Sequence, residues 1–181
     1  MNEIGTVKLE TERLILRRLE KNDAKELFDG IVNQKEFLYY ANKKQVTLEE
    51  EKASLENIEE KYQNKNYYNW VITLKNTKQI IGAVNFNVNL KNDSVMFNYV
   101  IDNRFTRKGY MTEALICVKK FAFNEIKVNR FEGGCVVKNY ASKRVMEKCG
   151  LTQEGVLKSY VKLSDGYHDM ILFAEINNKK I

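Results

Sequence analysis

A basic turn that contains glycine connects a predicted strand to a predicted helix. The strand ends in Phe97 to Asp102, and Arg107, Lys108 and Gly109 precede a helix start that reads Tyr110 to Leu115. The first amides of a helix have no partner inside the helix, so they attract anions, and the two cationic side chains add positive charge. The segment therefore predicts a site for a pyrophosphate group. The alternative is an ordinary helix entry with no ligand, since a strand, a basic turn and a helix often follow one another.

The elements that must hold this turn are predicted from apolar periodicity. Strand patterns occupy the ranges 11–19, 67–74, 79–90, 94–102, 130–137, 156–163 and 167–176. Helical patterns occupy 24–38, 47–62, the stretch that follows Gly109, and 140–149. This order predicts an α+β (mixed α/β) fold in a single domain, with a central twisted mixed sheet of about seven strands flanked by about four helices.

One crossover places the basic turn at the end of a pair of strands. The chain passes from the strand that ends at Asp102, through the helix after Gly109, to the strand over 130–137. Such a crossover is right-handed and sets the two strands parallel and adjacent. A ligand site is then expected at the C-terminal ends of these parallel strands.

The composition indicates a globular protein that needs no crosslink. Of its 181 residues, 44% are apolar and 30% are charged. Cys117, Cys135 and Cys149 are widely spaced and form no C-x-x-C pair, so neither a disulfide framework nor a zinc knuckle is predicted. Residues 1–8 lack the apolar segment of a signal peptide, and no range approaches the roughly 18 uninterrupted apolar residues of a membrane span. We therefore expect a cytoplasmic protein with buried thiols and no membrane contact.

The net charge raises the question of nucleic-acid binding. The formal charge is +6, and the basic residues largely alternate with acidic ones, as in Glu59-Glu60-Lys61. A nucleic-acid site needs basic residues clustered on one face, so sequence-specific nucleic-acid binding is not expected.

Several segments, in the right order, are similar to the GNAT superfamily of N-acetyltransferases. Gly109 stands at the first glycine of the family's acetyl-CoA motif, Gln/Arg-x-x-Gly-x-Gly/Ala, from which Thr106 and Met111 depart. The segment 139–151 resembles the family's Asn-x-x-Ser/Ala helix, which ends in Glu-Lys-x-Gly-Phe. Independent segments in order are harder to obtain by chance than one glycine motif.

The resemblance extends to the branch that acetylates the N-terminal alanine or serine of ribosomal proteins. Leu9 to Leu14 is similar to the usual start of that branch, and Thr112 to Leu115 to its helix opening. Glu154 to Leu157 and Asp165 to Asp169 look like its closing hairpin. The resemblance covers 9–176, which we take as the domain, with short tails at 1–8 and 177–181.

The resemblance implies an activity and a set of binding residues. The activity is transfer of an acetyl group from acetyl-CoA, used as a co-substrate, to a primary amine, by direct attack in a ternary complex and without a metal. A backbone amide near the end of the strand over 94–102 would hold the thioester oxygen. The implied acetyl-CoA-binding residues are Val100, Ile101, Arg107, Lys108, Gly109, Tyr110, Met111, Thr112, Asn139 and Ser142.

Two residues are the catalytic candidates. Many members of the family place a tyrosine seven residues after the helix asparagine, to protonate the departing thiolate. Here that position is Met146, so Ser142 is the candidate whose hydroxyl hydrogen-bonds the sulfur. Glu132 is the candidate general base, since a partly desolvated carboxylate gains basicity. The alternatives are that Asn139 and Ser142 serve only the helix start and that Glu132 is a surface residue. His168, in a predicted hairpin, is left outside the site.

The acceptor and two other function classes stay open at this stage. A groove along the sheet would favour a protein N-terminus as the acceptor amine, whereas a lid formed by 45–63 would favour a small molecule. The other classes are a non-catalytic CoA-binding regulatory module and a ribosome- or RNA-associated binding protein. Exposed sheet edges would allow a homodimer.

Overall fold

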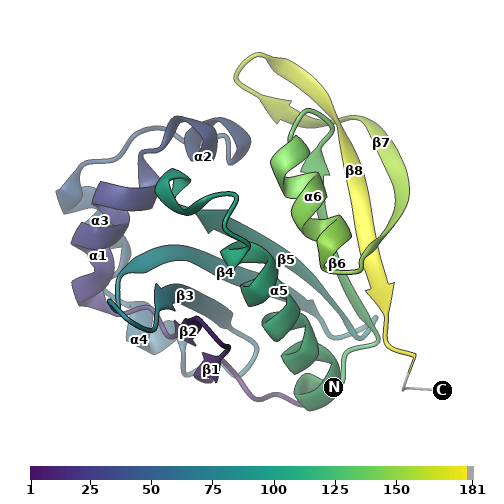
Figure 1. Cartoon of the computed structure of the whole chain (residues 1–181), viewed down its shortest axis with the longest axis horizontal. Coiled ribbons are helices and arrows are strands. Elements are labelled where there is room, and N and C mark those ends of the chain that lie inside the picture. Colours follow the sequence, from purple (N-terminus) through teal and green to yellow (C-terminus); the bar gives the residue numbers. More distant parts are fainter. Residues whose placement is uncertain (179–181) are drawn as a thin grey trace.

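The computed structural model describes residues 1–178, and one mixed sheet runs through them (Figure 1). The strand order is β1-β2-β3-β4-β5-β6-β8-β7, and the only parallel neighbours within the described residues are β5 and β6. The predicted parallel, adjacent pair is therefore confirmed. The strands are β1 (Leu9–Glu10), β2 (Leu14–Arg17), β3 (Tyr68–Leu74), β4 (Ile80–Asn89), β5 (Ser94–Ile101), β6 (Arg130–Val136), β7 (Thr152–Leu163) and β8 (Gly166–Ile176).

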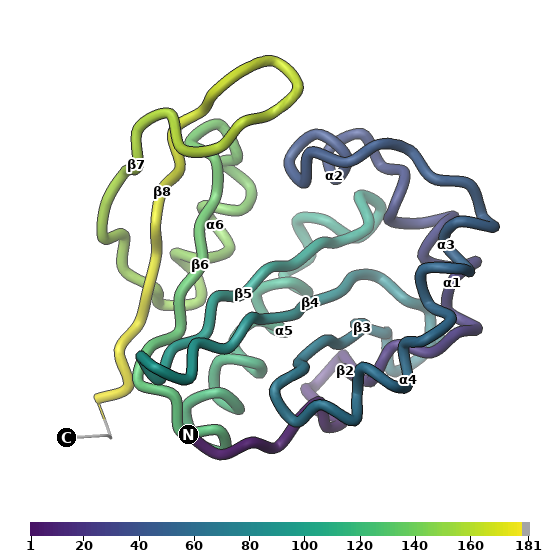
Figure 2. The backbone as a smooth tube through the Cα atoms, turned by 180° about the vertical axis from the view of Figure 1, so that it is seen from behind, coloured from purple at the N-terminus to yellow at the C-terminus, as the bar shows by residue number. Residues whose placement is uncertain are grey.

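Helices cover both faces of the sheet. One face carries α5 and α6, and the other carries α1, α3 and α4 near β3 and β4 (Figures 1 and 2). The helices are α1 (Ala24–Leu27), α2 (Lys35–Tyr40), α3 (Leu48–Ser54), α4 (Ile58–Lys61), α5 (Tyr110–Phe121) and α6 (Tyr140–Lys148). Short 3-10 turns occupy Lys21–Asp23 and Asn103–Phe105, and π turns follow α1 at Phe28–Val32 and α5 at Ala122–Ile126.

The two faces hold separate cores because neighbouring residues on a strand point to opposite sides. Ile72 and Ile81 belong to the main core beneath α5 and α6. Val71 and Ile80, one position away on the same strands, belong to the second core beneath the N-terminal helices. Both faces of β3 and β4 are thus covered where these residues lie.

The predicted mixed α/β fold is confirmed, with differences at particular elements. The sheet has eight strands rather than about seven, because Leu9 and Glu10 pair with Leu16 and Ile15 as a separate short strand. The last hairpin also begins earlier than predicted, since β7 starts at Thr152 opposite Ala174.

The two predicted N-terminal helices are each divided. The one over 24–38 passes through the π turn that contains Gly30, and α2 begins at Lys35. A Cβ at Gly30 would lie 2.9 Å from the Asp102 carboxylate, so close packing requires a residue that is a poor helix former. The helix over 47–62 becomes α3 and α4, because the chain turns between them to bury Leu55 and Ile58 in the second core.

Residues before β1 pack against the domain. Thr6 is fully buried and its hydroxyl donates to the carbonyl of Tyr67, while the carbonyl of Val7 accepts from the Trp70 indole. The C-terminal tail predicted at 177–181 lies partly outside the described residues.

Candidate functional site

The parallel strands β5 and β6 pair only at their beginnings. Ser94 to Met96 pair with Arg130 to Glu132, after which β5 continues on β4 and β6 continues on β8. Gly133 follows this pairing, and a Cβ there would overlap the ring of Phe97. The strands therefore separate into a V-shaped splay whose open end lies toward Ile101 and Val136.

Backbone groups at the end of β5 face this splay. The amide of Asp102 donates to the carbonyl of Ile81 on β4 at 2.8 Å. Because amides alternate along an antiparallel ladder, the Val100 amide also points toward β4, whereas the amides of Tyr99 and Ile101 point toward the splay. Of the two predicted residues Val100 and Ile101, Ile101 has the amide in the position to hold a carbonyl oxygen.

The start of α5 offers unpaired amides beside the splay. The first hydrogen bond within the helix runs from the Glu113 amide to the Gly109 carbonyl, so the amides of Tyr110, Met111 and Thr112 precede it. Gly109 has a φ of 80°, a left-handed conformation that favours glycine. Arg107 is exposed and adjoins this start, as does Lys108. The geometry fits an anion, as the sequence predicts.

Met111 departs from the small residue of the motif, yet it leaves the helix start open. Its side chain is 4% exposed and packs in the main core. Its amide is one of the three that precede the first helical bond. The substitution therefore does not obstruct an approach to the backbone.

Arg13 and Glu113 hold the start of α5 in place, and the apolar periodicity of the sequence does not reveal this pair. Glu113 accepts from Arg13 Nε at 2.7 Å and from the Thr11 hydroxyl at 2.5 Å, and Arg13 also donates to the carbonyl of Lys108. The Arg13 guanidinium lies 4.5 Å from the centre of the Tyr110 ring. The segment before β2 thus anchors both the basic turn and the first turn of α5.

The start of α6 approaches the splay from the other side. The Asn139 side chain caps this helix by accepting from the Ser142 amide at 3.1 Å. The Ser142 hydroxyl lies 2.7 Å from the Tyr99 hydroxyl on β5, so it bridges the splay rather than serving only its own helix. Met146, at the position usual for tyrosine, is fully buried in the main core. Ser142 is the hydroxyl that α6 presents here.

A match to a known domain family identifies the family of this protein. The profile described as "Acetyltransferase (GNAT) domain" matches residues 13–152, which is most of the chain. The chain belongs to the GNAT acetyltransferase family. It is therefore an acetyl-CoA-dependent N-acetyltransferase.

The sequences of related proteins align with this acetyltransferase along nearly its whole length. The uncharacterized N-acetyltransferase YoaA of Bacillus subtilis is 27% identical over 95% of this chain and 98% of that protein. The [ribosomal protein uS5]-alanine N-acetyltransferase of Escherichia coli is 24% identical over 94% of this chain and 91% of that protein. The solved structure of RimL, a ribosomal L7/L12 α-N-protein acetyltransferase in complex with coenzyme A, superposes with a TM-score of 0.82 at 22% identity, covering 94% of this chain and 98% of that one.

Glu132 lies at the base of the splay in this GNAT domain, on the face opposite Ser142. Phe131 and Cys135 point into the core beneath α5 and α6, so the alternating Glu132 points the other way. Arg130 Nε donates to its carboxylate at 2.5 Å, and Arg130 also pairs with Glu154. To act as a base, Glu132 would have to give up its ion pair with Arg130 and contact the amine of the acceptor instead.

The helix α2 bridges the two sides of the open end of the splay (Figures 1 and 2). Near its start, Glu36 accepts from the Asn103 side chain at 2.7 Å, just past the end of β5. Near its end, the Tyr39 hydroxyl lies 3.0 Å from both carboxylate oxygens of Asp165, at the tip of the β7–β8 hairpin. His168 also pairs with Asp165, at 2.7 Å. His168 therefore belongs to this bridge, and sequence periodicity gave no signal for it.

The thiols of the acetyltransferase are mostly buried. Cys135 and Cys149 are buried and Cys117 is half-buried, and all three are free. Burial raises the pKa of the Cys149 thiol to about 12. Burial also raises the pKa of Cys135, although its hydrogen bond with Ser142 acts in the opposite direction. Cys135 therefore adjoins the Ser142 hydroxyl as a neutral thiol.

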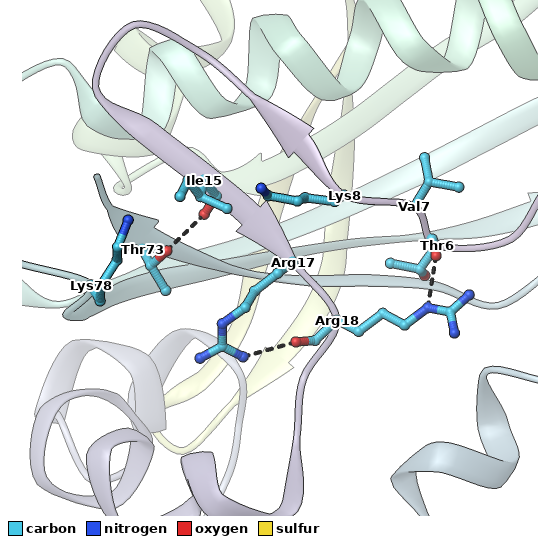
Figure 3. Close-up of a pocket in the computed structure, with 8 residues that line it drawn as sticks. All are labelled: Thr6, Val7, Lys8, Ile15, Arg17, Arg18, Thr73 and Lys78. Carbon is cyan, nitrogen blue, oxygen red and sulfur yellow. Dashed lines mark hydrogen bonds between the residues drawn. The ribbon is translucent and has the colours of Figure 1, made fainter. Parts of the chain in front are cut away.

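A hollow of about 680 Å³ lies by β2 and β3, separated from the splay by β4 and β5 (Figure 3). Its arginines already have partners. Arg17 pairs with Asp23 at 2.8 Å, and Arg18 donates to the carbonyl of Thr6 at 2.8 Å. We assign no function to this hollow.

Two other kinds of site are absent from residues 1–178. No group of three or more His, Cys, Asp or Glu side chains is placed to hold a metal ion. None of the helices described there has the length and apolar character needed to cross a membrane.

Proposed function

We propose that this acetyltransferase modifies the N-terminal amine of a protein, of the ribosomal-protein type, in the cytoplasm. The observation that carries the acceptor class is a row of uncharged amide side chains on the sheet beside the splay, of which Asn98 is the exposed one. Asn69, Asn85 and Asn98 lie directly opposite one another on β3, β4 and β5. Their neighbours along each strand face the main core, so all three point to the face opposite α5.

Amide side chains in such a row suit a peptide backbone. An asparagine side chain carries both donors and an acceptor, which are the groups that a peptide backbone presents in return. Asn69 Nδ2 already donates to the Tyr67 hydroxyl, and Asn98 Nδ2 lies 3.5 Å from Asn85 Oδ1, so a peptide would use the groups that remain. Asn98 is the closest of the three to the splay, since it precedes Tyr99 on β5. A peptide held along this row would bring its first residue to the splay. The α3–α4 segment, which would form the lid of a small-molecule site, packs against the second core.

The donor side of the proposal assigns roles to backbone and side-chain groups. The amides of Tyr110, Met111 and Thr112, with Arg107 and Lys108, would hold the pyrophosphate. The Ile101 amide would hold the thioester oxygen, whose negative charge grows as the amine attacks. As the carbon–sulfur bond breaks, the Ser142 hydroxyl would donate a hydrogen bond to the departing sulfur. Glu132 stays the proposed base, subject to release from Arg130.

Thermal unfolding tests the donor site first. At one hundred times its dissociation constant, a ligand specific for the folded state adds about 2.7 kcal/mol, or roughly 5 to 10 °C at this chain length. We expect acetyl-CoA to raise the Tm and ATP at the same concentration to have a much smaller effect. The double variant Arg107→Ala/Lys108→Ala should lose much of the shift. A matched double variant, Lys65→Ala/Lys91→Ala, removes two exposed charges elsewhere and should keep it.

An acceptor panel tests the substrate class. We expect acetylation of peptides that begin with alanine or serine, and none of the same peptides with a blocked N-terminus and an internal lysine. A preference for small amines would contradict the peptide proposal. Acetyl-CoA binding with no turnover of any amine would favour a regulatory module, and salt-sensitive RNA binding without a donor effect would favour a ribosome-associated protein.

A further inference from the structure

The Tyr99 hydroxyl is the closest polar neighbour that the structure gives the Ser142 hydroxyl. The two oxygens lie 2.7 Å apart, and the Tyr99 hydroxyl is also 3.2 Å from the Ser142 carbonyl oxygen. Tyr99 sits on β5 at the splay, while Ser142 sits in the first turn of α6. The pair therefore connects the two walls between which the thioester would lie.

The Tyr99 ring is held in place by a stack of aromatic side chains. Its ring centroid is 6.1 Å from that of Phe97, with the planes 15° apart, and Phe97 stacks in turn on Phe131 at 4.7 Å. Phe97 and Phe131 are both buried in the main core. A hydroxyl on such a ring has little freedom to leave Ser142, so its position is built into the fold.

The surroundings also keep the Tyr99 hydroxyl protonated. Burial raises the pKa of Tyr99 well above its usual value near 10, and the hydrogen bond with Ser142 only partly opposes this. At neutral pH the tyrosine is therefore a neutral group with one proton to donate. That proton has two acceptors within reach, the Ser142 hydroxyl oxygen and the Ser142 carbonyl oxygen.

We propose that Tyr99 is a positioning residue for Ser142, which rests on the role proposed above for Ser142. When the Tyr99 proton is donated to the Ser142 hydroxyl oxygen, the serine proton must point elsewhere. Two directions remain, toward the Cys135 thiol and into the splay, where the sulfur of the departing CoA would lie. A neutral thiol is only a weak acceptor, so the thiolate in the splay is the better partner. A hydroxyl that accepts one hydrogen bond also becomes a stronger donor of the next, because bonds in a chain polarise one another.

The pair stabilises the thiolate by hydrogen bonding and does not pass it a proton. A free thiol has a pKa near 8.5 and a tyrosine near 10 before any burial. Burial raises the Tyr99 pKa further, so complete transfer of its proton to the sulfur would be uphill. No proton therefore leaves the pair, and the thiolate can take one from water after release.

Bound CoA gives a readout that needs no acceptor amine. The ultraviolet absorbance of the thiolate can be titrated against pH on the enzyme, with desulfo-CoA as the blank. If Ser142 donates to the sulfur, the pKa of the bound CoA thiol is lowered. We expect Tyr99→Phe to raise that pKa by roughly half a unit or more, and Ser142→Ala to raise it further.

Single-turnover rates of acetyl transfer supply the second readout, in a double-mutant cycle. We expect Tyr99→Phe to slow the reaction by roughly 3- to 10-fold with acetyl-CoA affinity unchanged. In the Ser142→Ala background, the same change should have less than about a 2-fold effect, because the group that it positions is absent.

Tyr62→Phe is the matched control. The Tyr62 hydroxyl is likewise buried and hydrogen-bonded, to the Asn69 carbonyl and the Leu19 amide, and it belongs to the second core. Its loss should lower the Tm and leave the pKa of the bound CoA thiol unchanged. Equal effects of Tyr99→Phe with and without Ser142, or an unchanged thiol pKa, would overturn the inference. Failure of the wild-type protein to bind CoA would instead overturn the proposed donor site.

Discussion

Arg13 donates to Glu113 through Nε at 2.7 Å and so joins the segment before β2 to the first turn of α5. The two residues are 100 positions apart. The Glu113 side chain is 19% exposed, which makes this contact more sheltered than an ordinary surface ion pair. Because Arg13 also contacts Lys108 and Tyr110, the pair controls where the unpaired amides of α5 point.

Replacing Arg13 with alanine should therefore weaken donor binding more than it weakens the chemical step. We expect the KM for acetyl-CoA to rise by roughly 3- to 10-fold, with kcat reduced less, because the amides are no longer held in register. The free energy of unfolding should fall by about 1 to 2 kcal/mol, because two side-chain hydrogen bonds are lost, one to Glu113 and one to the Lys108 carbonyl. Steady-state kinetics and denaturant unfolding measure these effects. A fall in kcat with an unchanged KM would contradict this role.

The Glu113 carboxylate predicts a pH dependence of stability. Burial alone would raise the pKa of Glu113, but hydrogen bonds from Thr11 and Arg13 leave it below its usual value of 4.5. A carboxylate whose pKa is lowered by folding stabilises the folded state above the unfolded-state pKa, and the effect disappears as pH falls through the folded-state pKa. The difference in unfolding free energy between wild type and Glu113→Gln should be full at neutral pH and shrink below about pH 4.5.

The control for this measurement is Glu125→Gln. Glu125 is exposed in the π turn after α5 and should show little difference at any pH. If the wild type and Glu113→Gln differ by the same amount at acid and neutral pH, the lowered pKa is not what stabilises this contact.

The sequence predicted the elements better than the contacts between them. Periodicity located β3 to β6 and α5 because these elements bury one or both faces, and burial leaves a pattern in the sequence. The two divided N-terminal helices were missed because their breaks depend on tertiary packing, such as Gly30 against Asp102. Local propensity carries no information about a neighbour that lies so far along the chain.

In the candidate site, too, contacts between residues far apart in the sequence could not be predicted. The candidate anion site at Gly109 was proposed from the sequence, because a glycine and two cations before a helix are local signals. The contact between Tyr99 and Ser142 joins residues 43 positions apart, and only the splay of β5 and β6 brings them together. Tyr99 itself looks like an ordinary strand residue in the sequence. The predicted role of Ser142 was reached through resemblance, and its partner was found only in the structure.

Replacing Gly109 tests the effect of backbone strain at the start of α5 apart from the loss of side-chain contacts. Its φ of 80° is costly for any residue with a Cβ, by about 1 to 2 kcal/mol. We expect Gly109→Ala to lower the Tm by roughly 2 to 8 °C and to raise the KM for acetyl-CoA, since relief of the strain would move the amides. Gly155→Ala is the control, because a Cβ there meets open space. Equal losses in the two variants would contradict the importance of this conformation.

The bridge from α2 to the β7–β8 hairpin predicts an effect on the acceptor alone. The Tyr39 hydroxyl donates to Asp165, whose pKa is lowered mainly by the hydrogen bond from His168 and also by Tyr39, so the carboxylate stays charged at neutral pH. Tyr39→Phe removes the only hydroxyl that ties the described part of α2 to this hairpin. Because α2 stands over the open end of the splay, the proposed acceptor peptide should bind less tightly, with its KM raised by roughly 3- to 10-fold.

The donor side of the site should not respond to this change. The thermal shift with acetyl-CoA should be the same in Tyr39→Phe as in the wild type, because the amides of α5 are held by Arg13 and Glu113 rather than by α2. Tyr167→Phe, on the same hairpin but 65% exposed, removes a tyrosine hydroxyl without touching the bridge and should leave both values unchanged. If Tyr39→Phe weakened acetyl-CoA binding as much as peptide binding, α2 would be a general support of the fold rather than a wall of the acceptor site.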